Sequence, residues 1–562
     1  MSKALKIGLV ILIATSGLFG FIIKTEKPAE KKPSRTGGPV ARRNAVPPNI
    51  LVILADDMGY SDLGCYGGEI KTPNLDRLAA NGLRFRNAYN SARCCPTRAS
   101  MLTGQYQHKV GLDRNGKSMN RSGVTIAEAL KPHGYKTGMV GKWHLSEAVP
   151  LKDKKKHLDW LNHQYDPDIP FAEVSTYPLN RGFEKYYGII WGVVDYFDPF
   201  SLVNGDKPVK TVAKDYYITD DFSDKASEYI KDFSKKDDPF FLYLAYTSPH
   251  WPIQAPETDI QKYMRTYKDG WDVLQKKRRD RQIGMGFLTA ADNQLSPIEG
   301  RKWSELSAEE KAFNVKKMAT HAAMVDRMDA GIGRVLKTLE NTGELDNTLI
   351  VFMSDNGASP EIPRVPGYDR PSETRSGEKL LYADDIPTAA IGKEIAYTGI
   401  GPEWANAINS PYRLWKAESI GGGVRTSMVV HWKGLKTKKG STTDELTHVM
   451  DILPTILELT GTPYPKEYQG HKINEMDGKS LVPTFMNKKR SGYAQLFFEH
   501  EGGRALIEDD WKLVAPKQHD WELFNIKADR TESNDLMAKN PEKGRAMLQK
   551  YEAWSSKMGV SK

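Results

Sequence analysis

Two adjacent cysteines followed by an arginine are the residues of this chain best suited to chemistry. They lie in the segment Cys94-Cys95-Pro96-Thr97-Arg98-Ala99-Ser100-Met101-Leu102-Thr103-Gly104. Proline at a first helical position and the closing Thr-Gly predict a short helix that carries Cys94 at its N-terminus. The unpaired N–H groups there, together with the guanidinium of Arg98, would stabilise a negative charge beside Cys94. The alternative is a turn with two buried structural thiols.

Four oxygen-bearing side chains directly follow apolar runs of the sequence. Asp56 and Asp57 end one run, and Asp355 and Asn356 end another. Three carboxylates and one amide oxygen are hard ligands, which suit Ca²⁺ or Mg²⁺. Adjacent aspartates also repel each other unless a cation lies between them. These residues therefore predict a metal site, and the alternative is that they are structural turn residues.

The elements that must position these groups are predicted from apolar periodicity. Uninterrupted apolar runs indicate strands that are covered on both faces, at 49–54, 137–140, 240–246, 348–353 and 427–432. Capping residues and helical spacing predict helices at 72–82, 125–131 and 308–340. This alternation predicts an α/β fold with a large mixed, mostly parallel sheet sandwiched by helices.

That fold would bring the polar residues together. Lys142 and His144 follow one predicted strand, and His250 follows another. In an open α/β sheet, ligands bind outside the carboxyl ends of the strands. We therefore expect these basic groups to share one crevice with the carboxylates. Each of them taken alone could equally be a structural residue.

The organisation of the chain is predicted from composition. Residues 1–23 are basic and then apolar, which is typical of a signal peptide or a membrane anchor, and 24–46 form a polar linker. We expect a catalytic domain at 47–490 and a C-terminal subdomain at 491–562, built as a small antiparallel sheet plus one helix. The chain is accordingly expected to be exported, to the periplasm or beyond, or to be held by its N-terminal segment.

The charge does not indicate a nucleic-acid-binding protein, and the cysteine content does not indicate a disulfide-held one. The formal net charge is +9, but residues 1–45 contain nine Lys or Arg and only two Asp or Glu, so composition does not imply nucleic-acid binding. The three cysteines include an adjacent pair, so disulfides do not hold the fold. The basic run at 276–279 is interpreted as a solvated helix face, with attraction of an anionic substrate as the alternative.

The motif Cys-x-Pro-x-Arg followed by Leu-Thr-Gly resembles the signature of the type I, formylglycine-dependent sulfatases of the alkaline phosphatase superfamily. The spacing matches Cys94 and not Cys95, which precedes proline and is expected in an extended conformation. The resemblance implies that a separate maturation enzyme oxidises Cys94 to formylglycine. It also implies that Asp56, Asp57, Asp355 and Asn356 bind one Ca²⁺ together with that residue.

Further segments carry the same resemblance. The run Gly134-Tyr135-Lys136-Thr137-Gly138-Met139-Val140-Gly141-Lys142-Trp143-His144 is similar to the second sulfatase signature. It implies that Lys142 binds sulfate and that His144 is the base of the final step. By the same resemblance His250 contacts the leaving-group oxygen, and Lys416 is the last family lysine. One departure is Gly421, which stands where the family usually has glutamate. The segment 404–413 is similar to bacterial arylsulfatases.

The resemblance implies a sulfuric ester hydrolase that releases sulfate from a small molecule or a glycan. Two alternatives remain at this point. One is a phosphatase or phosphodiesterase of the same superfamily, since phosphate and sulfate share shape. The other is a non-catalytic glycan-binding relative, which would have no need of an intact Cys94 motif. Expected partners are the sulfated substrate and the maturation enzyme, without nucleic acid, and with a membrane only through the N-terminal segment.

Overall fold

The computed structural model describes residues 47–149, 151–164, 169–289, 292 and 294–560. The predicted leader and linker at 1–46 lie outside the described residues. No helix within the described part of the chain is long and apolar enough to cross a membrane.

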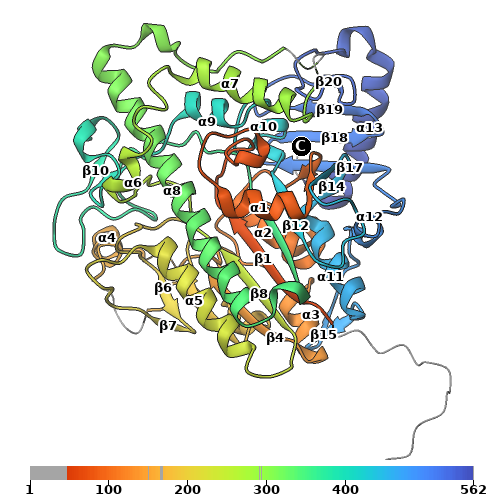
Figure 1. Ribbon diagram of the computed structural model, residues 1–562, viewed down its shortest axis with the longest axis horizontal. Coiled ribbons are helices and arrows are strands. Elements are labelled where there is room, and N and C mark those ends of the chain that lie inside the picture. The colour runs from red at the N-terminus through yellow and green to blue at the C-terminus, as the bar shows by residue number, and fades with distance from the viewer. Residues whose placement is uncertain (1–46, 150, 165–168, 290–291, 293, 561–562) are drawn as a thin grey trace, which may run out of the picture. The chain divides into compact units, whose positions relative to one another are not determined.

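A ten-stranded sheet forms the centre of the 47–562 unit (Figure 1). Its strands, in spatial order, are β13 (Ser441–Thr443), β2 (Leu83–Phe85), β12 (Met428–His431), β9 (Thr348–Ser354), β1 (Asn49–Ala55), β8 (Phe240–Ala245), β4 (Lys136–Gly141), β5 (Lys185–Ile189), β6 (Leu202–Asn204) and β7 (Lys207–Pro208). The five strands from β9 to β5 are mutually parallel, whereas β12 pairs antiparallel with β9. The predicted large, mixed and mostly parallel sheet is confirmed.

Alternating residues of β1 enter two different hydrophobic cores. Leu51 and Ile53 pack in the core that contains α1 (Pro73–Asn81), α5 (Ile218–Phe233) and α8 (Ala308–Asn341). Ile50 and Val52 pack in the core that contains α2 (Cys94–Thr103), α3 (Ile126–Leu130) and α11 (Ile452–Thr460). Because both faces of the strand are covered, its sequence is continuously apolar instead of alternating. Figure 1 shows α8 and α5 crossing one face of the sheet.

The C-terminal segment forms a second, antiparallel sheet with one helix. The sheet contains β17 (Gln495–His500), β18 (Gly503–Glu508), β19 (Trp511–Ala515) and β20 (Glu522–Asn525), followed by α13 (Pro541–Met558). The sequence did not predict β20, because this strand has only two apolar residues. The core beneath the sheet also contains Tyr89, Ile420 and Val424 from the first part of the chain.

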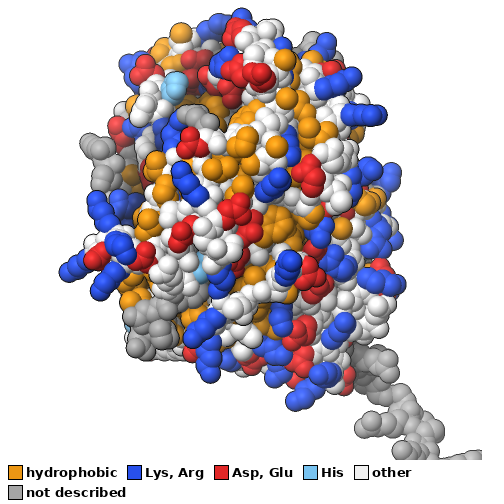
Figure 2. Space-filling view, turned by 90° about the vertical axis from the view of Figure 1, so that its left-hand side faces the viewer, with side chains coloured by type: hydrophobic (Ala, Val, Ile, Leu, Met, Phe, Trp, Pro, Cys, Tyr) orange, Lys and Arg blue, Asp and Glu red, His pale blue; other side chains and the backbone are white. Residues whose placement is uncertain are grey.

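The basic run at 276–279 lies on α7 (Trp271–Gly284) and divides between two faces of that helix. Lys276 and Lys277 are exposed, as expected for a solvated face. Arg278 is wholly buried, and its Nη1 and Nη2 lie 2.8 Å and 2.7 Å from carboxylate oxygens of Asp62 and Glu69. Interpreting the whole run as solvated was therefore wrong for Arg278, which continues the buried helical stripe of Trp271, Leu274 and Gln275. On the face shown in Figure 2, charges of both signs are interspersed.

We expect Arg278→Met to lower the free energy of unfolding by about 3 kcal/mol, because it leaves two buried carboxylates with fewer counter-charges. His321 remains 2.9 Å from Asp62, and Arg281 remains 2.9 Å from Glu69, which limits the loss. Lys277→Met is the matched control, since that side chain is 56% exposed and its ion pair among the described residues is with Asp269, which is exposed as well. Thermal unfolding that gave equal melting temperatures for the two variants would contradict this account.

Candidate active site

The polar residues that follow the strands meet at the carboxyl edge of the central sheet. Asp56 and Asp57 follow β1, Lys142 follows β4, and Asp355 follows β9. His250 comes five residues after the end of β8. The strands are parallel and adjacent, so their carboxyl ends open at the same edge. All five side chains are buried there.

The helix α2 brings Cys94 to this edge. It begins at Cys94, after Arg93 in an extended conformation, and it ends at Gly104 with a left-handed φ of 67°. Pro96 is thus the third helical residue and not the first, and Cys95 is helical and not extended. Proline is tolerated here because its missing N–H is one of those that have no partner inside a helix. The buried Cys95 side chain packs into the core with α2, away from the chemistry.

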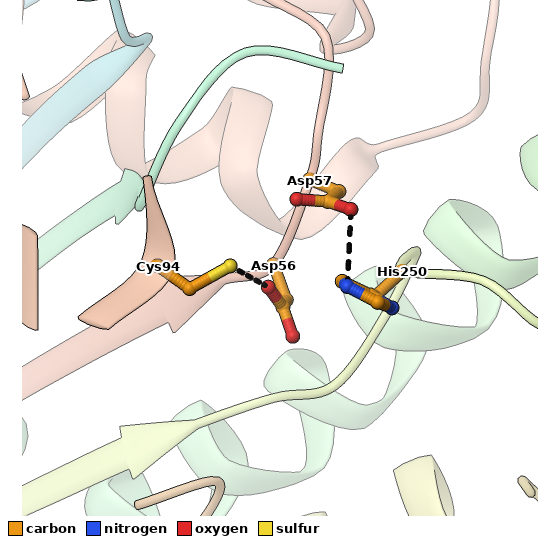
Figure 3. Close-up of side chains that lie close together, drawn as sticks. All are labelled: Asp56, Asp57, Cys94 and His250. Carbon is orange, nitrogen blue, oxygen red and sulfur yellow. Dashed lines mark hydrogen bonds and ion pairs between the residues drawn. The ribbon is translucent and has the colours of Figure 1, made fainter. Parts of the chain in front are cut away.

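Four potential metal ligands surround one point (Figure 3). One ligand atom each from Asp56, Asp57, Cys94 and His250 lies within 4.8 Å of the others. The Cys94 thiol lies 3.5 Å from Asp56 Oδ1, and His250 Nε2 lies 3.3 Å from Asp57 Oδ2. Asn356 donates from Nδ2 to Asp57 Oδ1 at 2.6 Å, and its buried Oδ1 has no hydrogen-bond partner. Buried oxygens in this arrangement suit a hard cation.

Asp355 has a different environment from the other carboxylates. Arg98 donates to Asp355 Oδ2 from Nη2 at 2.7 Å and from Nε at 3.1 Å. The backbone N–H of Asp57 donates to the other oxygen of Asp355 at 3.3 Å. Burial raises the pKa of Asp355, but Arg98, Lys142 and Lys416 together outweigh burial, so the pKa lies below its usual value. The side chain of Arg98 therefore binds Asp355 and links this carboxylate to α2, the helix on which Arg98 lies.

Two lysines neutralise the remaining carboxylates. Lys142 Nζ lies 2.6 Å from Asp56 Oδ2, and Lys416 Nζ lies 2.8 Å from Asp57. Burial raises the pKa of Asp56 to about 7, although Lys142 acts in the opposite direction. Burial lowers the pKa of Lys416, but Asp57, Cys94 and Glu361 together outweigh burial, so the net shift of this pKa is upward. Lys416 is therefore a stable ammonium at the site.

Both histidines of the site are held neutral. Burial, reinforced by Lys142, lowers the pKa of His144 well below its usual value. Burial lowers the pKa of His250 to about 3, despite the nearby carboxylate of Asp57. His250 Nδ1–H donates a hydrogen bond to the Trp251 carbonyl oxygen at 2.5 Å. His250 Nε2 therefore carries no hydrogen, and it accepts a hydrogen bond from Lys416 Nζ at 3.2 Å. His144 Nδ1 is buried without a hydrogen-bond partner.

His144 is placed by close backbone packing. Its φ of 55° lies in the left-handed region, which costs free energy for a residue with a side chain. A Cβ on Gly192 would lie 2.2 Å from His144 Cε1, so only glycine allows the imidazole to lie where it does. Strain of this kind is found where a side chain must be held in one orientation.

The sequence did not reveal Glu361. Its Oε1 accepts from Arg93 at 2.8 Å, and its Oε2 accepts from Trp251 Nε1 at 2.8 Å and from Lys416 at 3.4 Å. Lys416 and Arg93 together outweigh burial and keep the pKa of Glu361 below its usual value. Glu361 lies in an irregular segment after β9, without a spacing that predicts its position. An acidic residue a few positions after Asp355 and Asn356 was the only available signal.

A cavity of about 250 Å³ opens above these residues. Its lining includes His144, His250 and Lys416. The same lining includes Arg93, Trp191, Trp251, Glu361, Tyr368, Asp369 and Arg370. The site is therefore a pocket with a charged, buried floor and a mixed aromatic and polar wall.

Comparison with known proteins decides the family. The model of the family described as Sulfatase matches residues 48–462, which is most of the chain. The chain belongs to the sulfatase family. A second model, described as N-sulphoglucosamine sulphohydrolase, C-terminal, matches residues 414–552. This sulfatase is a sulfuric ester hydrolase. Membership of the family favours sulfate ester hydrolysis over the phosphatase and glycan-binding alternatives.

Relatives cover nearly the whole protein. An arylsulfatase of Klebsiella aerogenes is 31% identical over 80% of this chain and 94% of its own length. An uncharacterised sulfatase of Schizosaccharomyces pombe is 32% identical over 91% of this chain and 94% of its own. The crystal structure of Ps i-CgsB in complex with k-i-k-neocarrahexaose has a TM-score of 0.62 at 25% identity and covers 91% of this chain and 93% of that one. The sequence relatives and the similar structure thus cover both sheets of this chain.

We expect Glu361→Gln to lower kcat/KM for an aryl sulfate by about tenfold to a hundredfold, because hydrogen bonds between charged groups contribute roughly 1.5–3 kcal/mol. The neutral amide no longer holds the ammonium of Lys416. Glu467→Gln, at an exposed position of β15 (Glu467–Tyr468), is the matched control and keeps full activity. Equal kcat/KM for wild type and Glu361→Gln would show that Glu361 does not position the site.

Proposed function

We propose that this sulfatase uses a formylglycine formed from Cys94, together with one Ca²⁺, to hydrolyse a sulfate ester of a carbohydrate. The observation that carries the proposal is the position of Cys94, whose thiol lies 3.5 Å from Asp56 Oδ1 inside the ligand cluster. A maturation enzyme that reads the Cys-x-Pro-x-Arg motif would select this cysteine. The thiol itself is a poor nucleophile here, because burial raises the pKa of Cys94 well above its usual value.

The residues present fit a Ca²⁺ ion. Asp56, Asp57 and the unpartnered Oδ1 of Asn356 would hold it, with Asp355 and residue 94 completing the set. Mg²⁺ would fit the same oxygen chemistry less readily, because it needs a stricter geometry. When bound, the cation supplies positive charge that offsets the sulfate group and favours ionisation of an adjacent hydroxyl. Its charge would also compensate the repulsion between Asp56 and Asp57.

The protein's own groups divide the remaining work. Lys142 and Lys416 would bind the sulfate oxygens and stabilise the charge that develops in the transition state. Lys416 is the proton source for the leaving oxygen, since His250 Nε2 accepts a hydrogen bond from it and carries no proton. His144 is neutral and has an unpartnered buried nitrogen, so it can take the hydroxyl proton in the final step.

A carbohydrate substrate is supported by the relatives and by the pocket wall. An N-acetylglucosamine-6-O-sulfatase of Bacteroides thetaiotaomicron is 25% identical over 88% of this chain and 83% of its own length. The pocket lining adds three aromatic side chains, Trp191, Trp251 and Tyr368, to several charged ones. Aromatic faces stack on sugar rings, and charged groups bind hydroxyls.

Export is proposed from the N-terminal sequence. Residues 1–23 combine a basic start with an apolar run, which is the pattern of an export signal. Fractionation of the producing cells should find the sulfatase activity in the periplasm, the medium or the membrane fraction. Activity confined to the cytosol would contradict export.

We expect Cys94→Ala to abolish sulfate release, because the nucleophile is lost. Cys95→Ala is the matched control on the neighbouring buried thiol and should keep most of the activity. Peptide mass spectrometry of active enzyme should find an aldehyde at residue 94 and an unmodified thiol at residue 95. An aldehyde at residue 95, or full turnover by Cys94→Ala, would show that the wrong cysteine has been chosen.

We expect Ca²⁺ to raise the melting temperature of chelator-treated protein, because it binds the folded state alone. Asp57→Asn should reduce this rise strongly, since the variant loses one ligand charge. Asp346→Asn is the control, because that carboxylate is 71% exposed and pairs with Lys433 at the surface. An equal rise in wild type and Asp57→Asn would exclude the proposed metal site.

A further inference from the structure

Every cation on the pocket wall has its own carboxylate. Arg93 Nη2 lies 2.8 Å from Glu361, and Arg370 Nη1 lies 3.5 Å from Asp369 Oδ1. At the floor, Lys416 pairs with Asp57. The lining beyond the sulfate-binding floor is therefore electrically balanced. A second anionic group on a substrate would meet no uncompensated positive charge there.

The aromatic residues offer apolar surface to the pocket. Trp191 Nε1 donates to the Phe171 carbonyl oxygen at 2.7 Å, and Trp251 Nε1 donates to Glu361 at 2.8 Å. Because both indole N–H groups are already bonded, what these rings can offer a ligand is carbon surface. Tyr368, which is 67% exposed, adds a third aromatic ring to the lining.

Asp369 lies in this wall with hydrogen-bonding capacity to spare. Its Oδ1 accepts no hydrogen bond, although Arg370 lies 3.5 Å away, and its side chain is 17% exposed. The guanidinium of Arg370 is held by a bond of 2.9 Å from Nε to the Val365 carbonyl oxygen. A buried carboxylate oxygen without a donor calls for an explanation, and a ligand hydroxyl would supply one.

The cavity also limits the size of the substrate. Its volume of about 250 Å³ lies below the range of roughly 300–1,000 Å³ that is usual for drug-sized ligands. It therefore suits one ring together with its sulfate, and not several sugar units.

From these four observations we propose that the pocket selects one neutral sugar ring with a single sulfate ester, and that Asp369 is the residue that binds its hydroxyls. The proposal rests on the sulfatase function argued above. Arg370 orients Asp369 and cancels its charge, so a sugar with a carboxylate or a second sulfate is disfavoured. Removal of the charge of Asp369 would leave Arg370 uncompensated and would reverse this preference.

The first experiment uses matured full-length enzyme and compares substrates. The substrates are 4-nitrophenyl sulfate, a set of glucose, galactose and N-acetylglucosamine monosulfates, and the same sugars with a second sulfate. We expect the best neutral monosulfate to exceed its disulfated counterpart by at least tenfold in kcat/KM. Equal or higher kcat/KM for the disulfated sugar overturns the proposal. This comparison needs no variant, so it stands even if a substitution impairs folding.

The second experiment uses Asp369→Asn. Relative to 4-nitrophenyl sulfate, kcat/KM should fall by about tenfold for the neutral monosulfate and should rise for the disulfated sugar, because the wall gains a net positive charge. Asp346→Asn is the matched control and should leave both ratios unchanged. If Asp369→Asn lowers kcat/KM for all three substrates by the same factor, the role of Asp369 is structural and the proposal is overturned.

These outcomes separate the two proposals. If wild-type enzyme releases no sulfate from any substrate, the proposed function itself fails. If it hydrolyses 4-nitrophenyl sulfate but no sugar monosulfate, the sulfatase function stands and the assignment of the pocket to a neutral sugar is wrong.

Discussion

The pairing of buried charges at the carboxyl edge of the sheet is the constraint on which the rest of the site depends. Asp56 with Lys142, Asp57 with Lys416, and Asp355 with Arg98 form three pairs whose side chains are 2% exposed or less. An isolated charge in such a place costs several kcal/mol, so removal of any partner disturbs its neighbours. The parallel strands and α2 hold these pairs because both cores are packed around them.

The same burial sets the protonation states of the site. Surrounding cations and loss of water keep both imidazoles neutral, while opposing carboxylates keep Lys416 charged. A charged Lys416 thereby lies 3.2 Å from a neutral His250, and a neutral His144 lines the same pocket. Glu361 extends this arrangement outward, since it joins Lys416 to Arg93 on the pocket wall.

The sequence predicted those elements that are determined by interactions between residues close together in the chain. The buried strands, the helix at 72–82 and the capping box of α3 follow from apolar periodicity and cap chemistry, which act within a few residues. Glu361 and the burial of Arg278 depend on partners that lie far away in the sequence, so spacing could not reveal them. The helix with Cys94 at its N-terminus was predicted correctly, but Pro96 is its third residue and not its first, because proline fits more than one position of a first turn.

Gly421 is a point of contact between the C-terminal segment and the stretch of chain that follows Lys416. The family usually has glutamate here, but a Cβ at this position would lie 2.8 Å from the ring of Tyr412. A carboxylate is nevertheless present, because Glu532 Oε2 accepts from the Gly421 N–H at 3.2 Å and from Lys512 Nζ at 2.8 Å. Gly422 in turn donates its N–H to the Arg413 carbonyl oxygen, three residues before Lys416. Through Glu532, which Lys512 of the C-terminal sheet holds, the C-terminal segment therefore contacts the stretch of chain that carries Lys416.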